Sequence, residues 1–278
     1  MKTTTNLRKK YSSKIAYPTL LLTILALSIY LGSIFFAVNA TIPILFAVII
    51  NTIMAYLLFT SMHEASHGNI SGNQANLWLD EIVGWSSSLT LFAPFYLFKI
   101  IHFKHHAHTN DPQKDPDHWL ASKNFGTLLI HSFTVFPAYL YTGMKLLITD
   151  KQLPPVIKKE LTISFIFLTV MLISLGFMMY TWGWYYPIIL WLLPAFIAQA
   201  FLAIAFDWLP HHPHEKMERY LNTRVIDVPG ISLFLLSQNY HLIHHLYPTI
   251  PFYHYKNAYD EIEDEIHEKG VEVIRWMK

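Results

Sequence analysis

The sequence contains no cysteine. This absence excludes disulfide frameworks, thiolate zinc sites, iron–sulfur clusters held by the chain itself and cysteine nucleophiles. Charge is also scarce, because only 14% of the 278 residues are Asp, Glu, Lys or Arg, against about 25% in a typical soluble domain. The formal net charge of +1 gives no reason to expect nucleic acid as a partner. With 53% hydrophobic residues, the composition is that of a membrane protein.

Two long stretches carry no charged side chain. One runs from Ile15 to Met62 with a break at Pro43, and the other runs from Leu161 to Phe206 with a break at 181–184. Each half is close to the ~20 residues that cross a bilayer as a helix. Two such hairpins argue against buried core helices, and the predicted spans cover about residues 17–38, 42–62, 161–180 and 185–206.

The charges flanking the first span predict the orientation. Five basic residues precede it, so the N-terminus is expected on the cytoplasmic side, in a bacterial inner membrane; they are Lys2, Arg8, Lys9, Lys10 and Lys14. Two further apolar segments lie at about 79–101 and 125–147. If only one of them crossed the membrane, the histidine-rich segments would lie on opposite faces. We therefore predict that both are interfacial or re-entrant, with two crossings as the alternative, in a single domain over residues 1–278.

Histidine is abundant, with 16 copies, and it recurs in short motifs. One motif is H-x-x-x-H and two are H-x-x-H-H; their histidines are His63, His67, His102, His105, His106, His241, His244 and His245. On a helix, offsets of three and four place side chains on one face. A catalytic zinc takes three protein ligands, so eight imidazoles suit two ions better than one. Imidazole alone leaves iron, copper and zinc open.

Neutral ligands around two divalent ions need negative charge nearby. Five carboxylates beside the motifs are candidates to support the ligands: Glu64, Asp111, Asp115, Asp117 and Asp207. The first motif, HEASH, also has the H-E-x-x-H pattern of zinc proteases, in which Glu64 would act as the base. That alternative predicts one zinc per chain.

The three motifs, in this order and around two membrane hairpins, resemble the integral-membrane fatty acid desaturase and hydroxylase superfamily, the histidine-box di-iron enzymes. The resemblance implies an all-α integral membrane fold, with four transmembrane helices in two hairpins, interfacial helices and a cytosolic cap that carries a histidine-ligated di-iron site. It also implies a further ligand after the fourth span, four residues beyond an Asp or Asn. Asp207 and His211 match that spacing, and His212 is the rival for the position.

The sequence in and between the motifs is most similar to that of carotenoid β-ring hydroxylases. The matching phrases are HHAHTNDPQKDPDHW (105–119), FDWLPHHPHE (206–215) and QNYHLIHHLYPTIPFY (238–253). That group usually has aspartate after the first histidine, so Glu64 is a departure. The resemblance implies two iron ions, O2 as co-substrate, a hydrophobic lipid or carotenoid substrate, and an external ferredoxin or cytochrome-type electron donor. A fatty acyl desaturase is the alternative function, and an intramembrane zinc protease is a more remote one.

Other residues carry weaker expectations. Trp85, Phe92 and Phe95 are candidates to line a lipid pocket, although plain packing is the interpretation we favour. Four histidines off the pattern are expected in outer or surface positions: His108, His118, His214 and His254. The charged segment 260–278 is expected to be an exposed helix, which could offer a surface to the electron donor.

Overall fold

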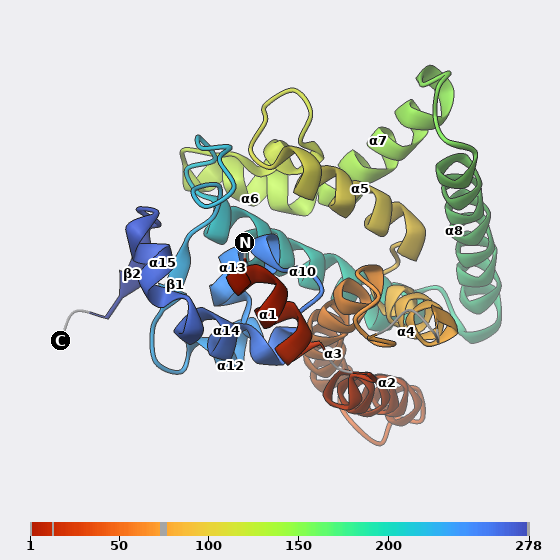
Figure 1. Cartoon of the computed structure of the whole chain (residues 1–278). Helices are drawn as coiled ribbons and strands as arrows, with labels where there is room; N and C mark the ends of the chain where they lie inside the picture. The colour runs from red at the N-terminus through yellow and green to blue at the C-terminus, as the bar shows by residue number, and fades with distance from the viewer. Residues whose placement is uncertain (1, 13, 73–76, 277–278) are drawn as a thin grey trace.

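The computed structural model describes residues 2–12, 14–72 and 77–276, and most of them are helical (Figure 1). Among these residues, four helical runs are long and apolar enough to cross a membrane. They are α2 (Tyr17–Val38), α3 (Ile44–Ser66), α8 (Pro155–Trp182) and the run Tyr185–His211. This confirms the predicted fold class of an all-α integral membrane protein with four spans in two hairpins.

The third span begins earlier than predicted. The sequence placed its start at 161, after the charged residues Lys158, Lys159 and Glu160, but α8 already begins at Pro155. Proline is favoured in the first turn of a helix, where its missing N–H costs no hydrogen bond. The charged residues therefore form the first turns of the span rather than a loop before it.

The fourth span is not a uniform α-helix. It consists of α9 (Tyr185–Pro187), a π-helical segment Ile188–Leu192, α10 (Leu193–Leu202), a second π-helical segment Ala203–Trp208, and α11 (Leu209–His211). Such π segments occur mostly at functional sites, because they rotate the side chains that follow. The second one lies directly before His211.

Neither middle apolar segment forms one long helix. The first is divided into α4 (Leu77–Thr90) and α5 (Phe95–His108), with Phe92 at a positive φ of 53° in the turn between them. The second is divided into α6 (Phe125–Phe133) and α7 (Val135–Thr149). All four helices are too short to span a bilayer as single helices. Their short lengths agree with the predicted interfacial placement, which stays a prediction.

The 3-10 helix η1 (Pro116–Leu120) packs beside α5, α6 and α7. The remaining elements form a cap with its own apolar core. They are α1 (Lys2–Tyr11), β1 (Val225–Asp227), α12 (Ile231–Leu235), η4 (Gln238–Tyr240), α13 (His241–Leu246), η5 (Phe252–His254), α14 (Tyr255–Glu261), α15 (Glu263–Glu268) and β2 (Val273–Arg275). Leu242, Ile243 and Tyr259 are fully buried in this core. Leu7 of α1 packs into the same cluster. The cap thereby ties the start of the chain to its end (Figure 1).

A small parallel sheet was not predicted. Val225 pairs with Val273 and Ile226 with Ile274. The expectation that 260–278 is helical is therefore wrong beyond Glu268, where the chain turns at Gly270 (φ 70°) and continues as β2. The β-branched residues of VEVI favour a strand, and charge alone had concealed that preference.

A polar contact joins the two hairpins inside the membrane. The Asn51 side chain bonds the Ser33 hydroxyl of α2 and donates to the carbonyl of Leu190 at 2.8 Å. Leu190 lies in the first π-helical segment, where regular helical pairing is interrupted. Asn51 is fully buried, so its hydrogen bonds are made away from water.

We expect Asn51→Leu to lower the free energy of unfolding by about 1 kcal/mol, the usual size of an interhelical hydrogen bond in a bilayer. The matched control is Thr52→Val, because the Thr52 hydroxyl bonds only the carbonyl of Val48 in its own helix. Unfolding in mixed detergent micelles measures both variants. Equal losses in the two would show that Asn51 does not join the hairpins.

Candidate metal centre

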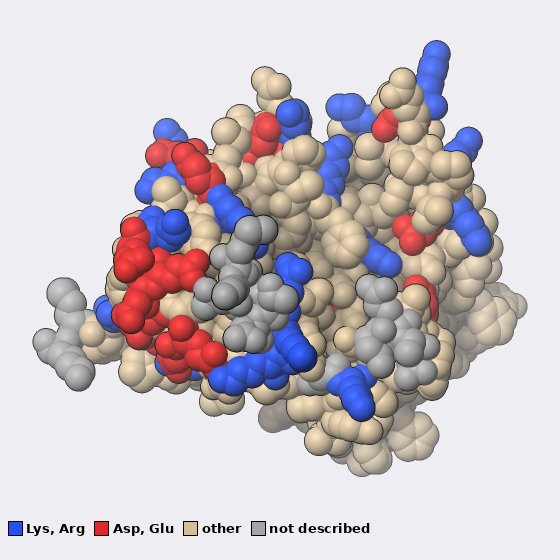
Figure 2. Space-filling model, in the orientation of Figure 1, with Lys and Arg blue, Asp and Glu red and all other residues tan. Residues whose placement is uncertain are grey.

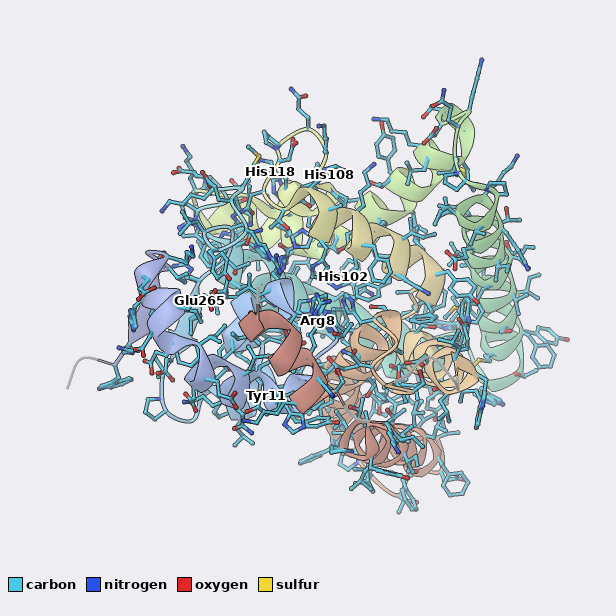
Figure 3. The ribbon with its side chains drawn as sticks, in the orientation of Figure 1. Arg8, Tyr11, His102, His108, His118 and Glu265 are labelled. Carbon is cyan, nitrogen blue, oxygen red and sulfur yellow. The ribbon has the colours of Figure 1, made fainter. Side chains whose placement is uncertain are left out.

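Nine histidines meet at one end of the helical bundle. His63 lies in the last turn of α3 and His67 directly follows this helix. The two H-x-x-H-H motifs lie on α5 and α13, and His211 is the last residue of α11. The structure brings together every histidine that the sequence predicted as a ligand: His63, His67, His102, His105, His106, His211, His241, His244 and His245. Figure 3 shows this concentration of ring nitrogens around His102.

The nine rings divide into two groups. His63, His67, His102 and His244 each offer a ring nitrogen within 4.8 Å of the others, and so do His105, His211, His241 and His245. His106 adjoins the first group, because its Nε2 lies 3.1 Å from Nε2 of His102 and 2.8 Å from Nε2 of His244. The arrangement therefore offers five nitrogens on one side and four on the other.

The outer nitrogens of the second group show which atoms face inward. Nδ1 of His211 donates to the carbonyl of Asn222 at 3.0 Å, since a carbonyl can only accept. Nε2 of His211 therefore carries a lone pair, and this atom is buried without a hydrogen-bond partner among the residues that the structure describes. Nδ1 of His241 lies 3.0 Å from Oε1 of Gln238. A hydrogen bond on one ring nitrogen fixes the tautomer and aims the other nitrogen at a metal.

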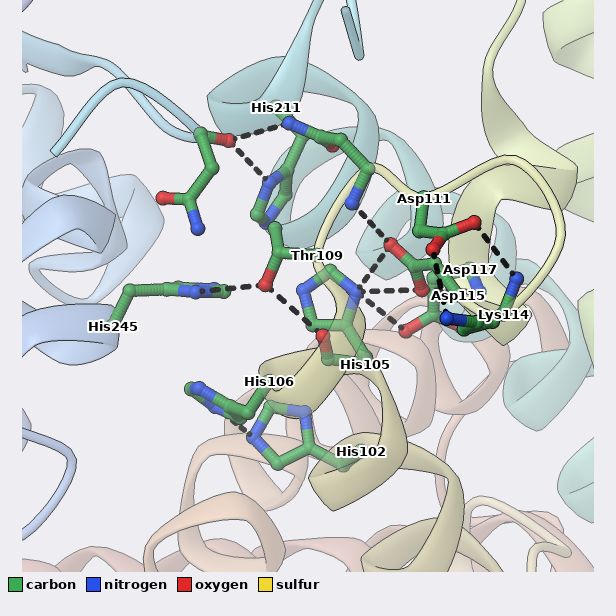
Figure 4. Close-up of polar contacts among 12 residues, drawn as sticks. His102, His105, His106, Thr109, Asp111, Lys114, Asp115, Asp117, His211 and His245 are labelled. Carbon is green, nitrogen blue, oxygen red and sulfur yellow. Dashed lines mark hydrogen bonds and ion pairs between the residues drawn. The ribbon is translucent and has the colours of Figure 1, made fainter. Parts of the chain in front are cut away.

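Two carboxylates hold the ring of His105, a third member of the second group. Nδ1 of His105 lies 3.0 Å from Oδ1 of Asp115 and 3.6 Å from Oδ2 of Asp117 (Figure 4). Burial opposes the charged imidazole, but these carboxylates outweigh it and raise the pKa of His105 to about 9. Burial, together with the neighbouring Asp115, raises the pKa of Asp117 to about 6 although His105 opposes that shift. The Tyr139 hydroxyl donates to Asp117 at 2.7 Å.

Glu64 supports the first group through a tyrosine. The Tyr255 hydroxyl lies 3.0 Å from Nδ1 of His244 and donates to Glu64 at 3.5 Å. The other oxygen of Glu64 accepts from the Asn69 side chain and the backbone N–H of Phe252. Glu64 is fully buried and both of its oxygens are engaged. It is therefore placed to orient a ligand, and no oxygen is presented to a substrate as a protease base requires.

Some predicted residues lie apart from the centre. Asp111 accepts from the backbone N–H groups of Gln113 and Lys114 in the turn after α5, and it contacts no box histidine in the described part of the chain (Figure 4). His212 turns outward and packs on Trp208 with ring centroids 4.7 Å apart. The structure thus places His211, and not His212, in the second group. His214 is buried, 6.1 Å from the His211 ring, as expected for an outer position.

An apolar cavity of about 90 Å³ reaches the histidines from the bundle. Phe59, Leu97, Phe136 and Phe206 are among its walls, and His63, His102, His105 and His241 lie at its inner end. Asp117, Asp207, Tyr139 and Gln199 supply the few polar groups. Trp85, Phe92 and Phe95 are not in its walls. Trp85 packs on Phe95, and Phe92 packs on Trp191, which agrees with the packing role that we favoured from the sequence.

The donor set fits two metal ions. Nε2 atoms approach one another at 2.8 to 3.1 Å in both groups, which is close enough for them to ligate one metal ion. Imidazole ligands without thiolate suit iron, copper or zinc. Four carboxylates stand nearby to offset positive charge, namely Glu64, Asp115, Asp117 and Asp207. The fold and this site define a helical membrane protein with a polyhistidine centre whose two groups could each hold a metal ion.

The family model of fatty acid desaturases matches residues 10–276, so the chain belongs to the fatty acid desaturase family. The family is one of membrane di-iron oxidoreductases, which agrees with the polyhistidine site. This confirms the resemblance found in the sequence.

Relatives within the family act on different substrates. A Delta(9) fatty acid conjugase-like enzyme of Dimorphotheca sinuata is 24% identical over 72% of this chain and 63% of its own length. A ferredoxin-type sn-1 acyl-lipid omega-3 desaturase of Nostoc is 23% identical over 76% of this chain and 64% of its own. A beta-carotene ketolase of Paracoccus is 29% identical over 70% of this chain and 71% of its own. The chain spans less than two thirds of the acyl-lipid relatives.

We expect His211→Ala to lose about one of two bound metal ions, because one group keeps only three of its four nitrogens. His212→Ala should retain both, because its ring faces away from the centre. Metal analysis of the two purified proteins by mass spectrometry measures the difference. Loss of metal only in the His212 variant would reverse the assignment.

We also expect Tyr255→Phe to weaken metal binding about tenfold, the lower range for losing an outer hydrogen bond to a ligand. The variant removes the hydroxyl between His244 and Glu64 and keeps the ring. Competition with a chelator measures the affinity. Tyr253→Phe is the control, since that ring lies on η5 and packs on Phe252; equal affinities in the two variants would contradict the role of Tyr255.

Proposed function

We propose that this protein is an O2-dependent di-iron oxidoreductase that hydroxylates C–H bonds of a carotenoid β-ring. The observation that carries the proposal is the polyhistidine centre at the inner end of an apolar cavity. The nine histidines would hold two iron ions, with His211 in the second group. When bound, the ions would supply reduction of O2 and removal of hydrogen from an unactivated C–H bond.

The chain's own residues would perform the remaining tasks. The apolar walls of the cavity exclude water and hold a long hydrophobic substrate with one end near His102 and His105. Asp115 and the Tyr255–Glu64 pair keep the ligand rings in position. Tyr139 and Asp117 line the same cavity, and the Tyr139 hydroxyl donates to Asp117 at 2.7 Å, so this pair is placed to hold a proton beside a bound substrate.

One observation favours a carotenoid over an acyl chain. The chain covers 71% of the length of the ketolase relative, whereas it covers 63% of the conjugase-like relative. The second candidate, a fatty acyl desaturase, is favoured by the number of acyl-lipid relatives such as the Nostoc desaturase. The zinc protease alternative receives no support from the position of Glu64, whose oxygens are both engaged.

We place the centre on the cytoplasmic side. Arg8, Lys9 and Lys10 precede the first span, and the two hairpins return the chain to that side. An external electron donor is required, because the chain has no cysteine for an iron–sulfur cluster of its own. A bacterial inner membrane provides both the hydrophobic substrate and access to such a donor.

Expression in a bacterial host that makes β-carotene tests the proposal. We expect hydroxylated carotenoid in cells with the wild-type protein and none in cells with His244→Ala. This variant removes one of the ring nitrogens of the first group. Pigments and fatty acids are measured together by liquid chromatography and mass spectrometry. New fatty-acid double bonds with unchanged carotenoid would favour the desaturase, and activity that survives in His244→Ala would exclude a role for the centre.

A further inference from the structure

A second hollow, with walls other than those of the apolar cavity, also reaches the histidines. It is a wide cleft whose walls come from α1, the end of α5, the segment 217–222 and the end of α13. His67, His106 and His245 form part of its wall, and none of these three lines the apolar cavity. We call this hollow the basic cleft, with Arg8, Arg219, Phe103, Met217, His67 and His106 as its defining residues.

The rim of the basic cleft carries positive charge without partners. Arg8 makes no ion pair in the described part of the chain, and Arg219 donates only to the carbonyl of Leu246, at 3.0 Å. Asp111 is the one acidic residue in the wall, and it is turned toward the N–H groups of its own loop and the Lys114 ammonium. The rim is therefore basic.

Helix α1 holds Arg8 in place. Leu7 is 3% exposed in the cap core, while Lys10 and Tyr11 both bond Glu261 of α14. Figure 3 shows Arg8 and Tyr11 on this helix, with Arg8 nearer the histidines. The acidic side chains gather elsewhere, over α14 and α15, beside the basic residues of α1 (Figure 2). An acidic partner would be drawn to the cleft and repelled from the tail.

The centre of the cleft is apolar and close to the candidate ligands. Phe103 is 42% exposed and Met217 is 58% exposed. The Phe103 ring lies 5.2 Å, centroid to centroid, from the ring of His67. An apolar centre within a charged rim is the usual anatomy of a protein interface. Here the contact surface is separated from the metal centre by single side chains.

We propose that the basic cleft docks a small acidic one-electron carrier protein, and that electrons enter the centre beside Phe103 and the outer edges of His67 and His106. The proposal rests on the proposed function. Hydroxylation combines R–H, O2, two electrons and two protons into R–OH and water. Each carrier molecule gives up one electron and is oxidised, so two docking events complete one turnover.

The experiment uses the iron-loaded full-length protein in phosphatidylcholine nanodiscs, with a reduced plant-type [2Fe–2S] ferredoxin as the probe. Arg8→Glu is compared with Lys9→Glu, which makes the same charge change on the same exposed helix but outside the cleft. Surface plasmon resonance gives the Kd, and stopped-flow absorbance gives the rate of electron transfer. Reduction by dithionite and methyl viologen controls for an intact centre.

We expect Arg8→Glu to weaken ferredoxin binding about tenfold and to flatten its salt dependence, as reversal of a rim charge does, with dithionite reduction unchanged. Lys9→Glu should weaken binding less than Arg8→Glu does, because its side chain does not line the cleft. Equal effects in the two variants would overturn the proposal. So would loss of binding in Glu268→Lys alone, which would place the donor on the acidic tail.

The two proposals fail separately. Binding and reduction are measured without any hydrophobic substrate, so they do not depend on which molecule is oxidised. If wild-type protein is reduced by ferredoxin in an Arg8-dependent way but forms no oxidised carotenoid or lipid, the docking proposal stands and the proposed function falls. If product forms while Arg8→Glu and Lys9→Glu bind alike, the docking proposal falls alone.

Discussion

The structure depends on the close approach of nine imidazole rings. Nε2 of His67 lies 2.8 Å from Nε2 of His102, and Nε2 of His106 lies 2.8 Å from Nε2 of His244. Burial, with neighbouring histidines adding to it, lowers the pKa of His102 and His244 well below the usual range, so these rings are neutral at pH 7. Neutral rings with converging lone pairs are ready to bind metal, and metal binding then contributes to folding.

Four helices bring their ends together at this cluster. The ends of α3, α5, α11 and α13 supply the rings, and the outer nitrogens are held by groups from other parts of the chain, such as Asn222 and Tyr255. The apolar cavity and the basic cleft then open on different sides of the same centre. In the function we propose, a hydrophobic substrate and a water-soluble electron donor therefore reach the centre without sharing a path.

The membrane spans and eight of the nine histidines could be predicted because both leave local patterns. Uncharged runs identify spans, and offsets of three and four identify one face of a helix. The spacing of Asp207 and His211 pointed to the ninth ligand only through the family resemblance; the structure adds that the second π-helical segment and the Asn222 carbonyl turn His211 inward, while His212 packs on Trp208.

The supporting carboxylates Glu64 and Asp115 were named from their places beside the motifs, but the tyrosine that links Glu64 to His244 could not be predicted, because it is distant from Glu64 in sequence. Tyr255 reaches Glu64 across 191 positions, and no local pattern marks that contact. Gln238 is close in sequence to its partner, because it precedes His241 by three residues on adjoining helical elements. That spacing could have suggested the contact. Asp111 was chosen for its position beside a motif, but its carboxylate completes a turn. The strand β2 was missed because pairing with β1 decides its conformation.

The metal content of the wild-type protein tests the central claim most directly. The protein is purified in detergent from cells grown with iron, and its metals are counted by mass spectrometry and characterised by Mössbauer spectroscopy. We predict about two irons per chain, both high-spin and ligated mainly by nitrogen, because two separate groups offer four or more imidazoles each. One zinc per chain, with iron absent, would contradict the account.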